Sequence, residues 1–315
     1  MKKPVVVSGI QPSGPLHIGN YLGALKNWVK IQNSGQYDCF FFIADYHSLT
    51  ESYNPGEKKE QIFNLAIDYL SAGLDPKKCT IFVQSQVPAC TELAWIFNTV
   101  TPISELERMT QFKDKASRQI KNINLGLFAY PVLQAADILL YHGQFVPVGE
   151  DQIQHIELTR AIARWFNNKY KTKYFPETKP LLTPAARIMS LTDPTKKMSK
   201  SLGDKHWLGV AEPFDAIFSK IKKAPTTSEG LKNLQAIYEA FSEDMKSPFN
   251  PAKMSETKRV LAEGISRHFA AGQKTKNDLL KNENYVNKVL ADGQSQAQAI
   301  ASKTITEVKK IIGVG

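Results

Sequence analysis

Short apolar segments alternate with helical patterns through the first half of this 315-residue chain. Each apolar segment has the length and composition of a buried strand: Pro4–Ser8, Cys39–Ala44, Thr80–Gln84 and Phe145–Val148. Between the second and the third, Asn54 and Pro55 are typical of the start of a helix, and Gly73 is typical of its end. Strand–helix–strand units of this kind predict an α/β fold with a doubly wound parallel sheet.

The strand pattern ends near residue 205, and the remaining chain has helical spacing. Four helical stretches follow, at residues 214–225, 231–241, 255–271 and 295–313. We therefore predict two domains, an α/β domain over residues 1–205 and an all-helical domain over residues 206–315. The last helix, at about 297–312, is expected to pack back on the first domain.

The composition limits the classes of function. A net charge of +10 favours a polyanionic partner such as nucleic acid, although a solvated lysine-rich surface explains the same charge. No apolar run is long enough to span a membrane, and the N-terminus lacks the apolar segment of a signal peptide. The three cysteines are isolated, which argues against a disulfide framework and against a zinc or iron–sulfur site. We expect a cytoplasmic protein with no resident metal.

Glycine and proline are concentrated where the first strand meets a helix, in the segment "SGIQPSGPLHIGN" at residues 8–20. By themselves they need only make a turn. Gly9, Gly14 and Gly19 also allow a ligand to approach the backbone closely, and a helix N-terminus favours phosphate. His17 adds a side-chain donor. The spacing fits neither the dinucleotide-binding fingerprint nor the P-loop.

A second basic segment, "KMSKS" at residues 197–201, places two lysines among small hydroxyl residues. A solvated loop would explain it if it stood alone. Together with "HIGN", however, it resembles the two signature sequences of class I aminoacyl-tRNA synthetases. The first signature usually reads His-Ile-Gly-His, so Asn20 replaces its last residue, whereas the second is complete.

Five further stretches are similar to bacterial-type tryptophanyl-tRNA synthetases. They are "SGIQPSG" (8–14), "ELERMTQFKDK" (105–115), "YPVLQAADILLY" (130–141), "VPVGEDQIQHIELTR" (146–160) and "ARIMSLTDPTKKMSKS" (186–201). The likeness runs from residue 5 to about 201 and returns in the last helix, while residues 202–250 differ from the usual pattern. It implies a Rossmann-like catalytic domain, a helical domain that binds the tRNA anticodon, and a homodimer.

This resemblance implies an ATP site, with Mg²⁺ neutralising the phosphates. The residues that match its nucleotide-binding positions are Gln11, Pro12, Ser13, Gly19, Asn20, Gly149, Glu150, Asp151, Ile188, Lys197, Met198, Ser199, Lys200 and Ser201. His17, Lys115, Lys197 and Lys200 match the groups that stabilise charge on the phosphates, with Lys113 as an alternative to Lys115. We expect the "KMSKS" loop to close over pyrophosphate.

The resemblance also implies a tryptophan pocket. The residues that match it are Tyr130, Gln134, Asp137, Gln152, His47, Val7, Val146 and Val148. We predict a helix that has Pro131 in its first turn and that places Tyr130, Gln134, Asp137 and Tyr141 on one side. Asp137 accepts from the indole N–H in the family, and Tyr130 and Gln152 meet the ammonium group. Gln134 stands where many relatives have Met. The three valines and His47 are equally explained as core or loop residues.

The implied reaction joins L-tryptophan to tRNA(Trp) through an adenylate formed from ATP, without a protein nucleophile. It requires positioned charge, and no editing domain when a substrate N–H is recognised. Three alternatives remain. A tyrosyl-tRNA synthetase has the same plan, an inactive paralogue would only bind tryptophan or tRNA, and a small-molecule adenylyltransferase would not need the helical half.

Overall fold

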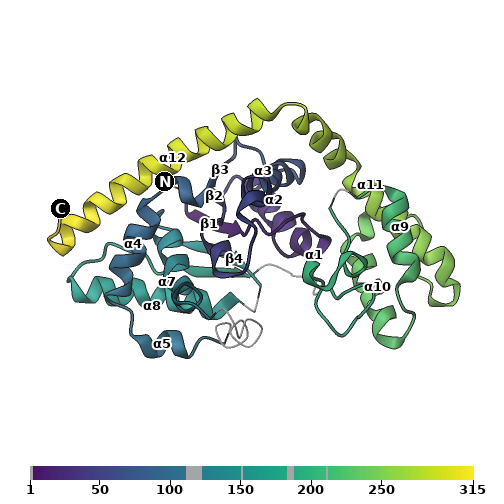
Figure 1. Ribbon diagram of the computed structural model, residues 1–315, viewed down its shortest axis with the longest axis horizontal. Helices are drawn as coiled ribbons and strands as arrows, with labels where there is room; N and C mark the ends of the chain where they lie inside the picture. The colour runs from purple at the N-terminus through teal and green to yellow at the C-terminus, as the bar shows by residue number, and fades with distance from the viewer. Residues whose placement is uncertain (1–2, 111–122, 150–151, 183–187, 211) are drawn as a thin grey trace.

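The computed structural model describes residues 3–110, 123–149, 152–182, 188–210 and 212–315. A five-stranded parallel sheet lies at its centre, in the order β3–β2–β1–β4–β5, with helices around it (Figure 1). The strands are β1 (Val5–Ile10), β2 (Asp38–Ile43), β3 (Cys79–Val83), β4 (Phe145–Val148) and β5 (Lys179–Leu182). The predicted fold class, an α/β doubly wound parallel sheet followed by helices, is confirmed.

The four strands expected from the sequence are present, with ends that differ by no more than two residues. Strand β5 was not predicted. It lies at the edge of the sheet, contains Pro180 and leaves Leu182 61% exposed, so it lacks the continuous apolar pattern of a buried strand. Edge strands of this kind are recognised only once their neighbour is known.

Residues on alternate positions of the central strands enter two different hydrophobic clusters. Val6 and Phe41 belong to one cluster, whereas Val7 and Phe40 belong to the other. Both faces of the sheet are therefore covered, as expected for a parallel sheet. The three cysteines are buried and free.

Strands β1 and β4 form the point at which the chain changes direction across the sheet. The chain runs from β1 to β2 and β3 on one side, and then returns to β4 and β5 on the other. Within these two fully described strands, pairing is limited to Val6 opposite Phe145. The carboxyl ends of β1 and β4 are thus not bonded to one another, and ligands of doubly wound sheets bind at such a place.

The helices of the first half follow the strand–helix alternation. They are α1 (Ile18–Asn20), a π-helical turn (Tyr21–Leu25), α2 (Lys26–Asn33), α3 (Pro55–Ser71), α4 (Ala89–Asn98), α5 (Ile103–Glu107), α7 (Leu125–Leu139) and α8 (Ile153–Lys169). Helix α3 begins as predicted, because the Asn54 side chain accepts the N–H of Gly56 at 3.0 Å. Gly73 follows its end with a φ of 103°.

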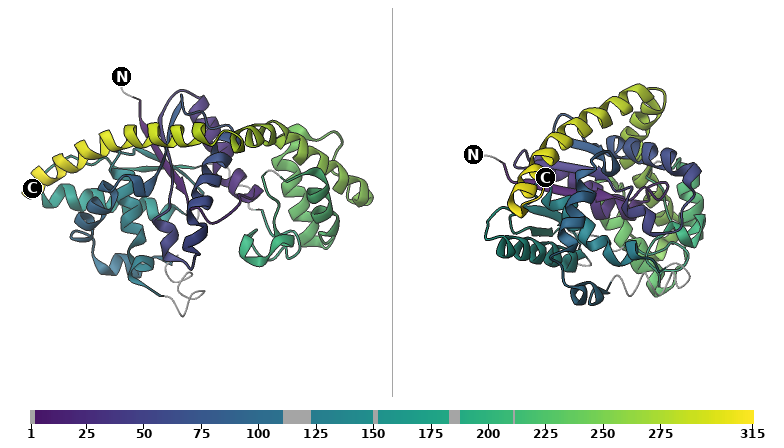
Figure 2. Two further views of the ribbon diagram at one scale, coloured as in Figure 1. Left: turned by 45° about the horizontal axis from the view of Figure 1, so that its top comes forward. Right: turned by 60° about the vertical axis from the view of Figure 1, so that its left-hand side comes forward.

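The second half contains α9 (Phe214–Lys223), α10 (Ser228–Ala240), α11 (Met254–Leu280) and α12 (Glu283–Ile312). Helix α12 begins well before residue 297, because the Asn282 side chain caps it at Tyr285 N. It returns along the sheet (Figures 1 and 2), where Gly293 passes so close to β3 that a Cβ would lie 1.8 Å from Ile81 O. None of the described helices is long and apolar enough to cross a membrane.

Candidate active site

The turn after β1 ends at His17, which caps α1. The His17 main-chain N–H donates to Asn20 Oδ1 at 3.3 Å, and the Asn20 N–H donates to His17 Nδ1 at 3.2 Å. Asn20, the departure from the usual signature, therefore completes a reciprocal cap. Burial, followed by the charges of Lys200 and Lys197, lowers the pKa of His17 to about 4. The ring is neutral at pH 7, and since Nδ1 accepts, the proton lies on Nε2 and is available for donation.

The second signature pairs with the segment before it. The Met198 N–H donates to Ile188 O at 3.1 Å, and the Ser190 N–H donates to Lys196 O at 2.8 Å. Ile188 and Met198 are both buried. Lys197 is exposed. The buried Met198 therefore holds this basic loop against the protein, while Lys197 faces solvent.

The chain after the second signature bonds to the first signature. The Ile18 N–H donates to Leu208 O at 2.9 Å, and the Val210 N–H donates to Leu16 O at 3.0 Å. His17 lies between these bonds, opposite Gly209 in an antiparallel bridge. Backbone hydrogen bonds thus join the first signature to the segment that follows the second.

Lys200 reaches the glycine- and proline-rich turn directly, because its Nζ donates to Ser13 Oγ at 3.3 Å. Burial lowers the pKa of Lys200 to about 8, and the Asp68 carboxylate partly opposes this shift. Ser199 Oγ and Ser201 Oγ lie 2.9 Å apart in the same loop. The arrangement places a cation beside the neutral His17, as anionic phosphates would require.

A further lysine that the sequence did not single out holds this turn. Lys58 Nζ on α3 donates to Pro12 O at 3.2 Å and to Ser48 Oγ at 3.0 Å. In the sequence it stands in "GEKKEQ", which is typical of a solvated helix face. Nothing in that pattern distinguishes it from its neighbours.

The other predicted nucleotide-binding residues are placed as follows. Gly19 lies beside the second signature, since a Cβ there would be 4.0 Å from Met198 Cβ. Gln11 is half-buried in the turn, and Gly149 is half-buried after β4. Three predicted site residues lie outside the described residues: Lys115, Glu150 and Asp151.

Asp137 on α7 is 3% exposed and has two polar neighbours. His47 Nε2 lies 2.8 Å from Asp137 Oδ2, and Gln84 Nε2 donates to both carboxylate oxygens, at 2.9 and 2.8 Å. Gln84 was not predicted. Its orientation is fixed because Gln84 Oε1 accepts the Tyr46 N–H at 3.1 Å. Burial raises the pKa of Asp137, and the bonds from His47 and Gln84 oppose that rise.

The predicted start of this helix was wrong. Helix α7 begins at Leu125, where the Asn124 side chain accepts the Leu127 N–H at 2.9 Å, and Pro131 lies inside the helix. Proline in the sequence suggested a first turn, but the Asn124 cap lies earlier. Tyr141 also departs from the predicted stripe. It lies beyond the end of α7 and stacks on Phe40 with ring centroids 5.0 Å apart, so it belongs to the core.

Tyr130 faces α8 from α7. Its hydroxyl lies 2.9 Å from His155 Nε2, a contact that the sequence did not indicate. Burial raises the pKa of Tyr130 to about 12, so the phenol stays protonated. Gln134 is half-buried on α7, and Gln152 stands half-buried at the start of α8. The two helices that carry the predicted ammonium-binding residues are therefore adjacent.

The three predicted valines are all buried, although in different clusters. Val146 and Val148 pack in a small cluster with Ile138, the residue after Asp137, whereas Val7 belongs to a large core cluster. The role of Val146 and Val148 in the pocket stays a prediction. The position of Val7 is also that of an ordinary core residue, and its role in binding stays a prediction.

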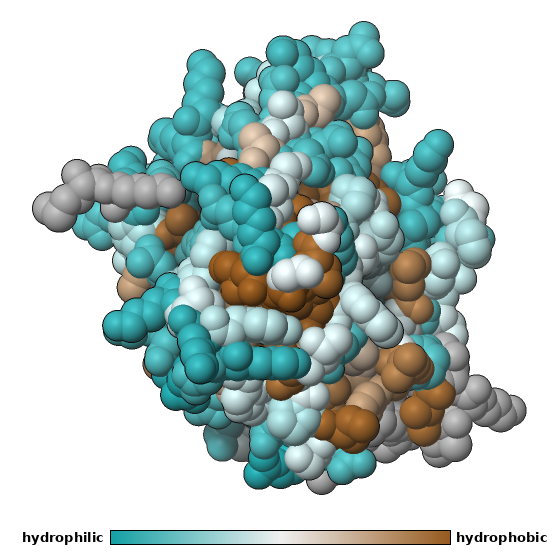
Figure 3. All heavy atoms as spheres, turned by 90° about the vertical axis from the view of Figure 1, so that its left-hand side faces the viewer, coloured by the Kyte–Doolittle hydropathy of each residue, from teal (hydrophilic) through white to brown (hydrophobic). Residues whose placement is uncertain are grey.

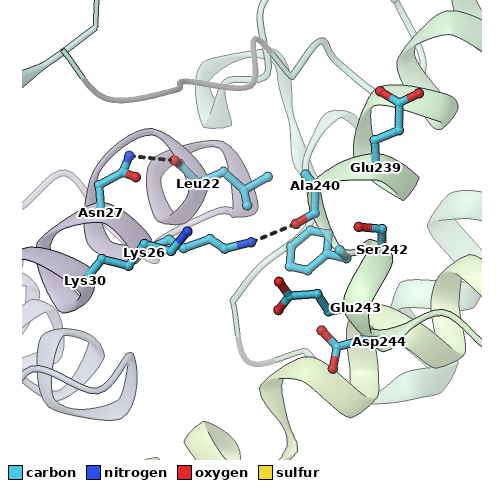
Figure 4. A pocket seen from close by; sticks show the side chains of 10 residues that line it. Leu22, Lys26, Asn27, Lys30, Glu239, Ala240, Ser242, Glu243 and Asp244 are labelled. Atoms are coloured by element: carbon cyan, nitrogen blue, oxygen red, sulfur yellow. Dashed lines mark hydrogen bonds between the residues drawn. The ribbon is translucent and has the colours of Figure 1, made fainter. Parts of the chain in front are cut away.

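A separate cavity of about 540 Å³ lies between α2 and the end of α10 (Figure 4). Lys26 and Lys30 line one side, and Glu239, Glu243 and Asp244 line the other. Lys26 Nζ crosses it to donate to Ala240 O at 2.9 Å. No residue of either signature lines this cavity.

Comparison with known proteins identifies the family. Residues 1–300 match the family model described as "tRNA synthetases class I (W and Y)". The chain belongs to this family. A tryptophan–tRNA ligase of Caldanaerobacter subterraneus subsp. tengcongensis is 44% identical over 325 residues, which cover 98% of each chain.

Solved structures of class I tRNA synthetases are similar over nearly the whole length. A tryptophanyl-tRNA synthetase of Campylobacter jejuni complexed with ADP and tryptophan has a TM-score of 0.83 and 31% identity. It covers 98% of this chain and 99% of its own. A tyrosyl-tRNA synthetase of Archaeoglobus fulgidus has a TM-score of 0.67 and 21% identity, with 88% and 90% covered. The latter shows the shared fold alone.

Proposed function

We propose that the chain is a tryptophan–tRNA ligase, which activates L-tryptophan with ATP and then transfers it to tRNA(Trp). The observation that carries this proposal is that the segment after the second signature bridges to His17 in the first, while Lys200 of the second signature reaches the same turn through Ser13. The relatives named tryptophan–tRNA ligase, similar over their full length, support the amino acid.

In the first step a carboxylate oxygen of tryptophan attacks the α-phosphorus of ATP. The new P–O bond forms as the bond to the β-phosphate oxygen breaks, which gives tryptophanyl-adenylate and pyrophosphate. His17 donates from Nε2 to a phosphate oxygen, and Lys200 and Lys197 stabilise charge that moves onto pyrophosphate. Mg²⁺ enters with ATP as part of the substrate, since it prefers to bind substrate phosphates.

Asp137 selects the amino acid in this proposal. Gln84 Nε2 spans both oxygens and His47 lies on Oδ2, so Oδ1 has the fewer protein partners. Oδ1 accepts the indole N–H. Since the carboxylate is buried, an amino acid that lacks this donor leaves it poorly satisfied. Tyrosine, which presents a phenolic hydroxyl in place of the indole N–H, is the amino acid against which this selection must work.

In the second step the ribose of the terminal adenosine of tRNA attacks the adenylate carbonyl, and AMP leaves. We assign residues 1–205 to this catalysis and residues 206–315 to binding of the anticodon. Eleven lysines and arginines against six acidic residues from Pro251 onward support a polyanionic partner there. The reaction belongs in the cytoplasm, where ATP and tRNA meet.

A homodimer is part of the proposal, and exposed apolar side chains support it. Trp95 on α4, Ile103 on α5 and Leu125 on α7 are 72%, 67% and 78% exposed. Figure 3 views this end of the molecule and shows hydrophobic groups gathered on its surface. Trp95→Glu is expected to convert a particle of about twice 35.3 kDa into a monomer in sedimentation equilibrium.

Amino-acid-dependent exchange of pyrophosphate into ATP tests the main proposal without tRNA. Exchange with tryptophan and not with tyrosine is expected. Exchange with tyrosine alone would keep the chemistry and reject the assigned pocket. Tryptophan binding without any exchange would favour an inactive paralogue.

A further inference from the structure

An ion pair with a buried carboxylate joins the helical half of the chain to the first signature. Asp68 on α3 is 4% exposed, and its Oδ1 lies 2.7 Å from Lys276 Nζ on α11. The other oxygen, Oδ2, accepts the main-chain N–H of Leu16 at 3.4 Å. Leu16 precedes His17, so one carboxylate contacts both α11 and the segment that carries the histidine.

The contact between α11 and α3 is close enough to fix this pair. A Cβ at Gly272 would lie 2.7 Å from Ser71 O, so the two helices meet with no side chain between them. Gly272 is one turn before Lys276, and Ser71 is about one turn after Asp68. This packing of α11 on α3 brings Lys276 to Asp68.

The pair also sets the charge near the phosphate side of the site. The negative charge of Asp68 favours the protonated form of Lys200, the cation that contacts Ser13. Lys276 neutralises that carboxylate from the side opposite Leu16. Without Lys276, Asp68 would lack its ion-pair partner and would present a buried negative charge beside a site for a triphosphate, which weakens binding of the triphosphate.

We propose that Lys276 is a positioning residue for ATP binding: by pairing with Asp68 it holds the Leu16–His17 segment and cancels a negative charge beside the nucleotide. It rests on the proposed function, because the anion concerned is the triphosphate of ATP. Through it, the placement of α11, a helix of the half assigned to tRNA, controls the site that activates the amino acid.

Lys276→Met tests the proposal by steady-state pyrophosphate exchange with purified full-length chain. We expect KM for ATP to rise roughly tenfold, because the Asp68 carboxylate, no longer paired, repels the triphosphate from a neighbouring position. KM for tryptophan should change less than about twofold. Lys276→Arg should restore the wild-type KM for ATP. Lys274→Met, an exposed lysine on the same helix, is the matched control.

The double variant Asp68→Asn with Lys276→Met separates charge from packing. It removes both charges and keeps an acceptor for the Leu16 N–H, so KM for ATP should return to within about threefold of wild type. A double variant as impaired as Lys276→Met, or an equal rise in both KM values, would overturn the proposal. A wild-type chain without tryptophan-dependent exchange would instead reject the proposed function.

Discussion

Asp137→Asn removes one charge from the pocket and keeps the shape of the side chain. Gln84 presents its NH₂ group to both carboxylate oxygens, and its orientation is fixed by the Tyr46 N–H. An asparagine at this position therefore places its own NH₂ beside the Gln84 NH₂ in either orientation. A buried donor then faces another donor, and in one of the two orientations the acceptor for the indole N–H is lost as well.

The cost can be worked from these contacts. A hydrogen bond to a charged group contributes about 1.5–3 kcal/mol, and a buried donor without an acceptor costs about 1–3 kcal/mol. Together they predict a fall in kcat/KM for tryptophan of roughly 10²–10⁴-fold. KM for ATP should change little, because Asp137 contacts neither signature.

The assay compares tryptophan with its benzothiophene analogue, in which sulfur replaces the indole N–H. The wild-type chain should prefer tryptophan strongly in pyrophosphate exchange, and Asp137→Asn should lose most of that preference. If the variant is slower but discriminates as well as wild type, Asp137 does not accept from the indole and the reasoning fails.

Two pH dependences follow from the signature residues. The unfolded chain protonates His17 near pH 6.5 and the folded chain near pH 4, so acidification from pH 7 to pH 5 should lower the free energy of unfolding by about 2 kcal/mol. Urea unfolding should show this loss in wild type and a smaller one in His17→Gln; equal losses would contradict it. Lys200 loses its proton near pH 8, so kcat/KM for ATP should fall above that pH. Lys200→Arg should shift the fall to higher pH, and an unshifted profile would assign it to another group.

Local patterns predicted the strands and the capped helices well. The interval from Asn54 to Gly73 contains both boundary signals of α3, and β4 has the ends expected from its apolar run. The prediction failed where a residue type is compatible with more than one position in a helix, or where a strand has no apolar pattern. Pro131 suggested the start of a helix, whereas an asparagine several residues earlier begins it. The edge strand β5 had no apolar pattern to detect.

The functional residues also divide into those that the sequence could identify and those that only the structure revealed. The signature residues His17 and Lys200 could be named from the sequence because their neighbours form motifs. Their protonation could not, since burial and nearby charges, the two lysines for His17 and Asp68 for Lys200, set the pKa of each. Lys58 and Gln84 contact predicted site residues but stand in segments without a motif. His155 lies in a stretch that resembles the family, yet nothing in that stretch indicated its contact with Tyr130.

The sequence by itself determined the parallel sheet, the helical second half and the residue types available for chemistry, because these depend on periodicity and on short motifs. Only the tertiary structure decided which of those residues meet. Asp68 and Lys276 are more than two hundred positions apart, and no local pattern relates them. They become partners because α11 lies directly on α3 at Gly272, and a charge buried by that packing must be paired there.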